Sequence, residues 1–141
     1  MNGFLLDTNV ISELVRRTPD PTVLKWFASL DEALIYVSVL SLGELRKGVA
    51  SLPPSRRRAE LDQWIESAFK TRFGDRLLLI DATVAERWGF IAAMAKSKGI
   101  ALAVIDGLLA ATALHHNLAI ATRNVSDFEK VGVPLVNPWQ K

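Results

Sequence analysis

Five short apolar runs, each bounded by polar residues, predict five β-strands. The runs do not alternate between apolar and polar positions, which indicates strands that are covered on both faces, as in a parallel sheet. They cover residues 3–6, 34–37, 77–80, 118–121 and 134–136.

The segments between these runs have the apolar spacing of amphipathic helices. The segment 39–52, for example, places Leu42, Leu45 and Val49 on one stripe and ends at a pair of prolines. Thr83 and Glu86 form the pattern of a capping box, which predicts the start of another helix. The predicted helices cover residues 10–17, 39–52, 55–73, 83–98 and 106–116.

Strands that alternate with helices predict an α/β fold, in which a central, mainly parallel sheet is flanked by helices as an α/β/α sandwich. In such a sheet the carboxyl ends of the strands lie along one edge, where ligands bind. The chain has 141 residues, of which 50% are hydrophobic, and we expect one domain over residues 1–141.

Composition narrows the classes of function. Lys and Arg number 17 against 15 Asp and Glu, so the chain is not a polycation that coats nucleic acid by charge alone. The absence of cysteine excludes disulfides and thiolate zinc sites. The most apolar stretch, 101–121, contains Asp106 and two histidines, which argues against a membrane span. With no pattern of a secretory signal at the start, we expect a cytoplasmic protein.

Four carboxylates stand in apolar surroundings. Asp7 follows the first predicted strand, Asp106 opens an apolar helix, Glu44 lies on a helix among small residues, and Asp127 comes soon after the fourth strand. If they converge at one edge of the sheet, their mutual repulsion is costly unless a cation neutralises it. Mg²⁺ prefers oxygen ligands and is the natural candidate, and Mn²⁺ can substitute for it.

Each of these acids also has a structural interpretation as a helix cap, because capping is common for an acid in a first turn. Asp7 or Asn9 could cap the first helix, and Asp106 the last long one. Two further pairs match the spacing of capping boxes, Ser41 with Glu44 and Asn124 with Asp127. Asp81 also ends a predicted strand, and for this residue we favour a structural turn or cap.

Four motifs in order carry a resemblance that covers essentially the whole chain. They are LLDTNVISEL at 5–14, SLGELRKG at 41–48, DGLLAATA at 106–113 and ATRNVSDF at 121–128. The motifs closely resemble those of PIN-domain ribonucleases, and the chain looks most like the VapC and FitB toxins of bacterial type II toxin–antitoxin pairs. Those chains share this length and often end in an Asn-Pro-Trp like that at 137–139.

The resemblance implies a metal-dependent endoribonuclease, a hydrolase of RNA phosphodiester bonds. Its acidic quartet falls on Asp7, Glu44, Asp106 and Asp127. Asp7 and Asp106 match the usual direct Mg²⁺ ligands of the family, while the other two complete the site. In addition, Asn9 and Thr122 match polar positions that support it. The proline that many relatives carry near the third acid is missing, which blurs the predicted start of that helix without removing a ligand.

The resemblance also implies partners, namely a second copy of the chain in a homodimer and a small antitoxin protein. The complex with the antitoxin would bind operator DNA. Two alternatives stay open. One is a PIN nuclease that processes RNA without an antitoxin, and the other is a non-catalytic subunit of a DNA-binding repressor complex. The fold does not choose an RNA target.

Basic and aromatic residues offer candidate contacts with RNA. Arg46 and Arg123 lie closest in sequence to the acidic residues and are the candidates for the RNA backbone. For the three arginines at 56–58 we favour a solvated helix face. Among the aromatic residues, we expect those at positions 64, 88 and 90 in the core or an interface, whereas Trp26 and Trp139 stay open between packing and base stacking.

Overall fold

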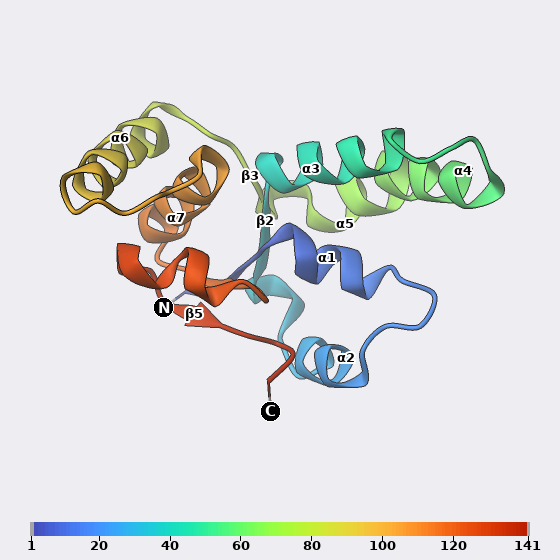
Figure 1. Cartoon of the computed structure of the whole chain (residues 1–141). Helices are drawn as coiled ribbons and strands as arrows, with labels where there is room; N and C mark the ends of the chain where they lie inside the picture. The colour runs from blue at the N-terminus through green and yellow to red at the C-terminus, as the bar shows by residue number, and fades with distance from the viewer. Residues whose placement is uncertain (1, 141) are drawn as a thin grey trace.

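The computed structural model describes residues 2–140 and shows a five-stranded, all-parallel sheet with helices on both faces (Figure 1). The order of the strands across the sheet is β3-β2-β1-β4-β5. All five predicted strands and the parallel arrangement are therefore confirmed. The strands are β1 (Phe4–Leu6), β2 (Ile35–Ser38), β3 (Leu77–Leu78), β4 (Ala119–Ala121) and β5 (Leu135–Val136).

Strand β1 lies at the centre of the sheet and is buried on both faces. Its Leu5 pairs in register with Tyr36 of β2 and Ile120 of β4. Successive side chains of a strand point to opposite faces. Accordingly, Leu5 belongs to the hydrophobic core on one face and Leu6 to the core on the other. This explains why the predicted strands are continuously apolar.

Helices cover the two faces of the sheet. The pair α6 and α7 packs on the face of Leu5, while α1, α3 and the segment from α4 to α5 pack on the face of Leu6 (Figure 1). The helices are α1 (Thr8–Leu14), α2 (Pro21–Ala28), α3 (Val39–Ala50), α4 (Arg56–Gln63), α5 (Lys70–Phe73), α6 (Ala82–Ser97) and α7 (Val104–His116). A π-helical segment, Trp64–Phe69, joins α4 to α5, so the predicted helix over 55–73 is confirmed as one helical run.

Several helices begin earlier than predicted. Helix α1 starts at Thr8 and α7 at Val104, two residues before the predicted starts in each case. The capping box at Thr83 is wrong, because α6 starts at Ala82 and its cap is Asp81, whose carboxylate accepts from the backbone N–H of Val84 at 2.9 Å. The structural interpretation of Asp81 is thus confirmed.

The sequence analysis missed helix α2 and misplaced the cap of α3. The sequence held a signal for α2, an aspartate followed by a proline. In the structure Asp20 caps the helix by accepting from the N–H of Thr22 at 2.8 Å, and Pro21 occupies the first helical position. In α3 the cap is Ser38, which accepts from the N–H of Leu40. The predicted capping box of Ser41 with Glu44 is therefore wrong, and Glu44 lies beyond the first turn.

Among residues 2–140, every helix is too short or too polar to span a bilayer.

Helices α6 and α7 approach each other closely at Gly107. A Cβ atom at this position would stand 2.9 Å from both Cδ1 and Nε1 of Trp88 on α6. Leu102, which precedes α7, lies 3.3 Å from the same point. The missing side chain thus lets the indole pack against the first turn of α7, the turn that carries Asp106.

We expect Gly107→Ala to destabilise the protein, because the added methyl group forces the Trp88 ring out of its place. Overpacking of this kind costs about 1–3 kcal/mol, which exceeds the gain in helix propensity. Urea unfolding measures the effect, with Gly89→Ala on α6 as the matched control. Open space surrounds Gly89, so the control variant should be as stable as the parent or gain up to about 1 kcal/mol. Equal unfolding midpoints for the two variants would contradict this packing argument.

Candidate active site

Asp7 occupies the carboxyl end of β1 and has both of its carboxylate oxygens engaged. Its Oδ1 accepts from the backbone N–H of Thr8 at 2.8 Å, which caps α1. Its Oδ2 accepts from the hydroxyl of Thr122 at 2.8 Å. The residue is only 9% exposed. The capping interpretation of Asp7 is confirmed, and the same contacts fix its carboxylate at the edge of the sheet.

Thr122 and Asn9 form a small network behind Asp7. The Thr122 oxygen, fully buried at the end of β4, accepts from the N–H of Asn124 at 3.0 Å and from Nδ2 of Asn9 at 3.4 Å. The Oδ1 atom of Asn9 accepts from the backbone N–H of Arg123 at 3.3 Å. Asn9 therefore links α1 to the segment after β4 and does not cap α1. Both predicted supporting residues contact the site in this way.

Glu44 reaches the site from α3 through a residue that the sequence analysis missed. The hydroxyl of Thr8 donates to Oε1 of Glu44 at 2.7 Å. This bond joins the first turn of α1 to α3 and orients one carboxylate beside another. The available signal was the position of Thr8 directly after Asp7, in the first turn of the helix that the acid caps.

Asp106 and Asp127 complete the acidic group without the capping roles that were open for them. Asp106 is the third residue of α7, whose cap position holds Ala103 and makes no side-chain bond. Asp127 is exposed in the 3₁₀ turn Val125–Asp127, and Asn124 makes no capping bond to that turn. Both capping interpretations are therefore wrong. Neither carboxylate accepts a side-chain hydrogen bond from residues 2–140.

Electrostatic coupling shows that the four carboxylates lie near one another. Burial raises the pKa of Asp7, and the charges of Glu44 and Asp127 raise it further, against the lowering effect of the bonds from Thr122 and Thr8. Burial also raises the pKa of Asp106, helped by the charges of Asp127, Asp7 and Glu44. Asp81 is absent from both sets of neighbours. The structure thus brings together all four acids predicted from the sequence and separates them from the purely structural one.

The donors of this site suit a hard divalent cation that keeps part of its water shell. Across residues 2–140, no three carboxylates or imidazoles stand close enough to hold one ion together. Mg²⁺ commonly binds through one or two carboxylates and several waters, so the arrangement fits that ion. The two histidines end α7, where the carbonyl of His116 accepts from Asn2 before β1. They are therefore remote from the carboxyl ends of the strands, and the donors at the site are oxygens.

The predicted RNA-contacting arginines differ in their surroundings. Arg46 is turned toward α4 and the π-helical segment after it, where it pairs with Asp62 at 2.8 Å and Glu66 at 2.6 Å. These bonds hold its guanidinium away from the four carboxylates of the site. In contrast, Arg123 is exposed, with its guanidinium 5.0 Å from the centre of the Trp139 ring. Arg123 is thus the candidate that the structure places beside the site.

The arginines at the start of α4 are only partly solvated. Arg57 donates to the carbonyl of Val15 at 2.7 Å, and Arg58 donates to that of Leu52 at 2.9 Å. The prediction of a solvated face holds for the exposed Arg56 and is wrong for its two neighbours, which tie loops to α4.

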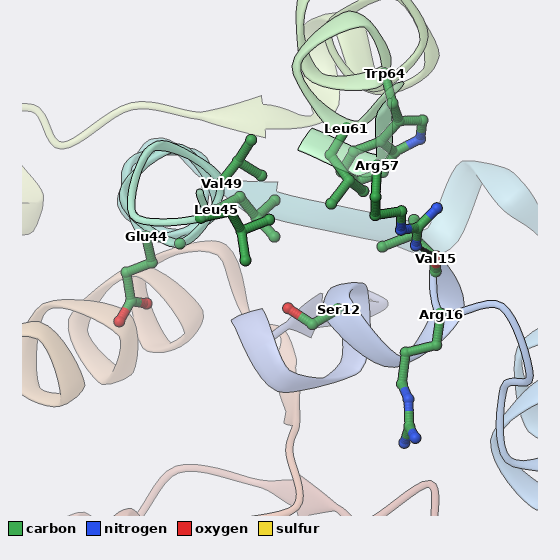
Figure 2. Close-up of a pocket in the computed structure, with 11 residues that line it drawn as sticks. Ser12, Val15, Arg16, Glu44, Leu45, Val49, Arg57, Leu61 and Trp64 are labelled. Carbon is green, nitrogen blue, oxygen red and sulfur yellow. Dashed lines mark hydrogen bonds between the residues drawn. The ribbon is translucent and has the colours of Figure 1, made fainter. Parts of the chain in front are cut away.

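A cavity of about 250 Å³ opens beside Glu44, between α1, α3 and the start of the helical run at α4 (Figure 2). Glu44 lies at one end of the cavity, and Val15 and Arg57 lie at the other. The walls between them are mainly apolar, with Leu45 and Val49 from α3. An apolar surface therefore adjoins the acidic group.

Known proteins share this arrangement of the whole chain. The family model described as PIN domain matches residues 4–134. Toxin FitB of Neisseria gonorrhoeae is 39% identical over 135 residues, which cover 96% of this chain and 97% of that protein. A VapC ribonuclease of Sinorhizobium fredii is 36% identical over 136 residues, with 96% and 97% covered.

Solved structures agree with these sequence relatives. The crystal structure of FitAcB from Neisseria gonorrhoeae matches with a TM-score of 0.92 and 38% identity, covering 98% of this chain and 99% of the other. A structure of FitAB bound to a DNA fragment also has a TM-score of 0.92, at 37% identity and with 98% and 96% covered. The sheet, the four acids and these matches all agree. The chain therefore belongs to the PIN-domain family and is similar over nearly its full length to VapC and FitB toxins.

Proposed function

We propose that the protein is a Mg²⁺-dependent endoribonuclease that acts as the toxin of a type II toxin–antitoxin pair. The observation that carries the proposal is the meeting of four charge-coupled carboxylates from separate elements, two of which have no structural bond to explain them. The names of two relatives, ribonuclease for VapC and toxin for FitB, support this function. Since its substrate would be cellular RNA, we place the protein in the cytoplasm.

The residues around Asp7 have separate parts in this mechanism. A divalent ion held by Asp7 and Asp106 would offset their repulsion and supply an electrophile for the phosphate together with an acidified water. Thr122 and the N–H of Thr8 keep Asp7 in one orientation. Thr8 does the same for Glu44 through Oε1. The second oxygen of Glu44 bonds to no residue from 2 to 140 and can accept a proton from a water aligned for in-line attack.

We further propose a small antitoxin protein as partner. Similar structures, such as that of FitAB bound to a DNA fragment, support such a complex and its binding to operator DNA. The apolar cavity beside Glu44 supports it too, because a segment seated there would reach the acidic group. Homodimerisation of the chain belongs to the same proposal.

Asp7→Asn and Asp106→Asn should each lower RNA cleavage by roughly a thousandfold, because the ion contributes several kcal/mol of charge stabilisation. The assay uses purified protein, a panel of structured and single-stranded RNAs, and Mg²⁺ or Mn²⁺ or chelator. Asp81→Asn is the matched control, since Asp81 also follows a strand and caps a helix but lies outside the quartet. It should cleave at the parent rate. Full activity in either site variant, or in chelator, would refute the proposal.

Asp106→Asn should raise the melting temperature at pH 7 in chelator by a few degrees. The pKa of Asp106 is raised in the folded state. Below the unfolded-state pKa of about 4 the side chain is protonated, and its contribution to folding stability is fully present. This contribution is lost as the pH rises through the folded-state pKa, because the carboxyl group then ionises in the folded protein. The gain over the parent should thus vanish near pH 4. Added Mg²⁺ should stabilise the parent more than the variant. A lower melting temperature of the variant at pH 7 would contradict the electrostatic argument.

Thr8→Val should reduce kcat roughly tenfold with little change in KM, because Glu44 loses a hydrogen bond to its charged carboxylate that is worth about 1.5–3 kcal/mol. Thr8→Ser keeps the hydroxyl and serves as the control, with near-parent kcat expected. Steady-state cleavage of one RNA substrate measures both. Equal kcat values for the two variants would show that Thr8 does not position Glu44.

A further inference from the structure

A second pocket, of about 290 Å³, lies beyond the acidic group. It separates the C-terminal turn from the connection between α1 and α2. Its walls include Glu13, Arg16, Pro19, Asp20, Arg123 and Trp139. Its volume is close to the lower end of pockets that hold small ligands, about 300 Å³. The roles of the acidic quartet do not use these residues.

Trp139 is fixed as a platform on one wall of this pocket. Its backbone N–H donates to Oδ1 of Asn137 at 3.0 Å, and the backbone N–H of Gln140 donates to the carbonyl of Asn137 at 3.1 Å. Pro138, between them, is buried. These bonds close a turn that leaves the indole half-buried, with its face toward the Arg123 guanidinium. The guanidinium and the indole thus lie next to each other on this wall.

On the other wall of the pocket, acidic side chains bind a basic side chain and backbone N–H groups. Glu13 is 5% exposed and binds Nη1 of Arg16 with both oxygens, at 3.1 and 3.3 Å. It also accepts from the backbone N–H of Asp20 at 2.9 Å. The carboxylate of Asp20 caps α2. Two arginines and two carboxylates therefore line the pocket, with Arg16 bound to Glu13 on one wall and Arg123 on the other. This balance of charge suits a planar, neutral group with hydrogen-bonding edges better than a bare phosphate.

The pocket is connected directly to the catalytic edge. The backbone N–H of Arg123 donates to Asn9, Asn9 donates to Thr122, and Thr122 donates to Asp7. These three bonds fix the backbone of Arg123 relative to the first acid of the quartet. The pocket therefore adjoins the acidic group through Arg123 and Asn9.

We infer that this pocket binds one unpaired nucleobase of the RNA, stacked against the Arg123–Trp139 pair, next to the phosphate that is cleaved. This inference rests on the proposed nuclease function. Aromatic and arginine planes recognise bases of single-stranded RNA in this way. Trp139 also packs against the hydrophobic core on the face of Leu6, which confirms packing, one of the two roles that its sequence position left open. Base stacking by the part of the ring that faces the pocket is the inferred role.

The test measures RNA binding without cleavage. Fluorescence anisotropy in chelator gives the Kd of the parent, Trp139→Ala, Trp139→Phe and Arg123→Gln for a panel of labelled single-stranded RNAs, and for an abasic sugar-phosphate strand of equal length. We expect Trp139→Ala and Arg123→Gln to weaken RNA binding about tenfold, since stacking is worth roughly 1–3 kcal/mol per base, a change of about tenfold for each 1.4 kcal/mol. Binding of the abasic strand should stay as in the parent for Trp139→Ala. Trp139→Phe keeps a ring and should retain most of the affinity.

Two controls match the substituted side chains. Phe90→Ala removes an aromatic residue that is 77% exposed on α6, and Arg56→Gln removes an exposed arginine at the start of α4. Neither should change the Kd for RNA. Urea unfolding checks that each variant folds. If Trp139→Ala does not fold, Trp139→Phe replaces it in the comparison. The ratio of the Kd for the abasic strand to the Kd for RNA should then be the same for Trp139→Phe as for the parent.

Three results would overturn the inference. They are unchanged RNA binding in Trp139→Ala and Arg123→Gln, an equal loss for RNA and the abasic strand in Trp139→Ala, and no RNA binding by the parent. A loss of binding to a copurified protein partner, with RNA binding intact, would assign the pocket to that partner instead. A base-dependent loss in a protein that fails to cleave RNA with Mg²⁺ would support the pocket while refuting the nuclease proposal, so the two failures are distinguishable.

Discussion

The burial of the Asp7 carboxylate at the carboxyl end of β1 is the constraint on which the rest of the site depends. A buried charge is costly unless hydrogen bonds or an opposite charge compensate for it. Two hydrogen bonds do so in part, from Thr8 and Thr122, yet the pKa of Asp7 remains raised because burial is the largest influence. The neighbouring acids add repulsion to this cost. The fold therefore leaves uncompensated negative charge at one defined place, and a cation can neutralise it.

The parallel sheet makes this concentration of charge possible. Strands β1 and β4 are adjacent and parallel, so Asp7 and Thr122 follow paired residues and their side chains meet. The cap of α1 and the site share the same carboxylate, which ties the position of the helix to the geometry of the acids. As a result Thr8, in the first turn of α1, is placed to hold Glu44 of α3. Local structure and the chemistry of the site thus depend on the same few bonds.

Sequence reasoning predicted the strands well because a buried parallel strand such as β1 is apolar at every position. It predicted the starts of helices less well, since the spacing of Ser41 and Glu44 matches a capping box in the middle of a helix as readily as at its start. It gave no reason to separate Arg46 from the acids, because only tertiary packing shows that Asp62 and Glu66 take up its guanidinium. The four acids were found through their motifs, whereas Thr8 required the contact between α1 and α3.

Asp106 shows why a structural explanation of the quartet is insufficient. An acid in the first turn of a helix gains roughly 0.3–1 kcal/mol from the helix dipole, which lowers its pKa. The pKa of Asp106 is nevertheless raised, because of its burial and the charges of Asp127, Asp7 and Glu44. A residue chosen for helix stability would stand at the cap, where Ala103 makes no side-chain bond. The chain instead places its acid three residues later, where burial and the neighbouring carboxylates raise its pKa, a cost that a shared cation would relieve.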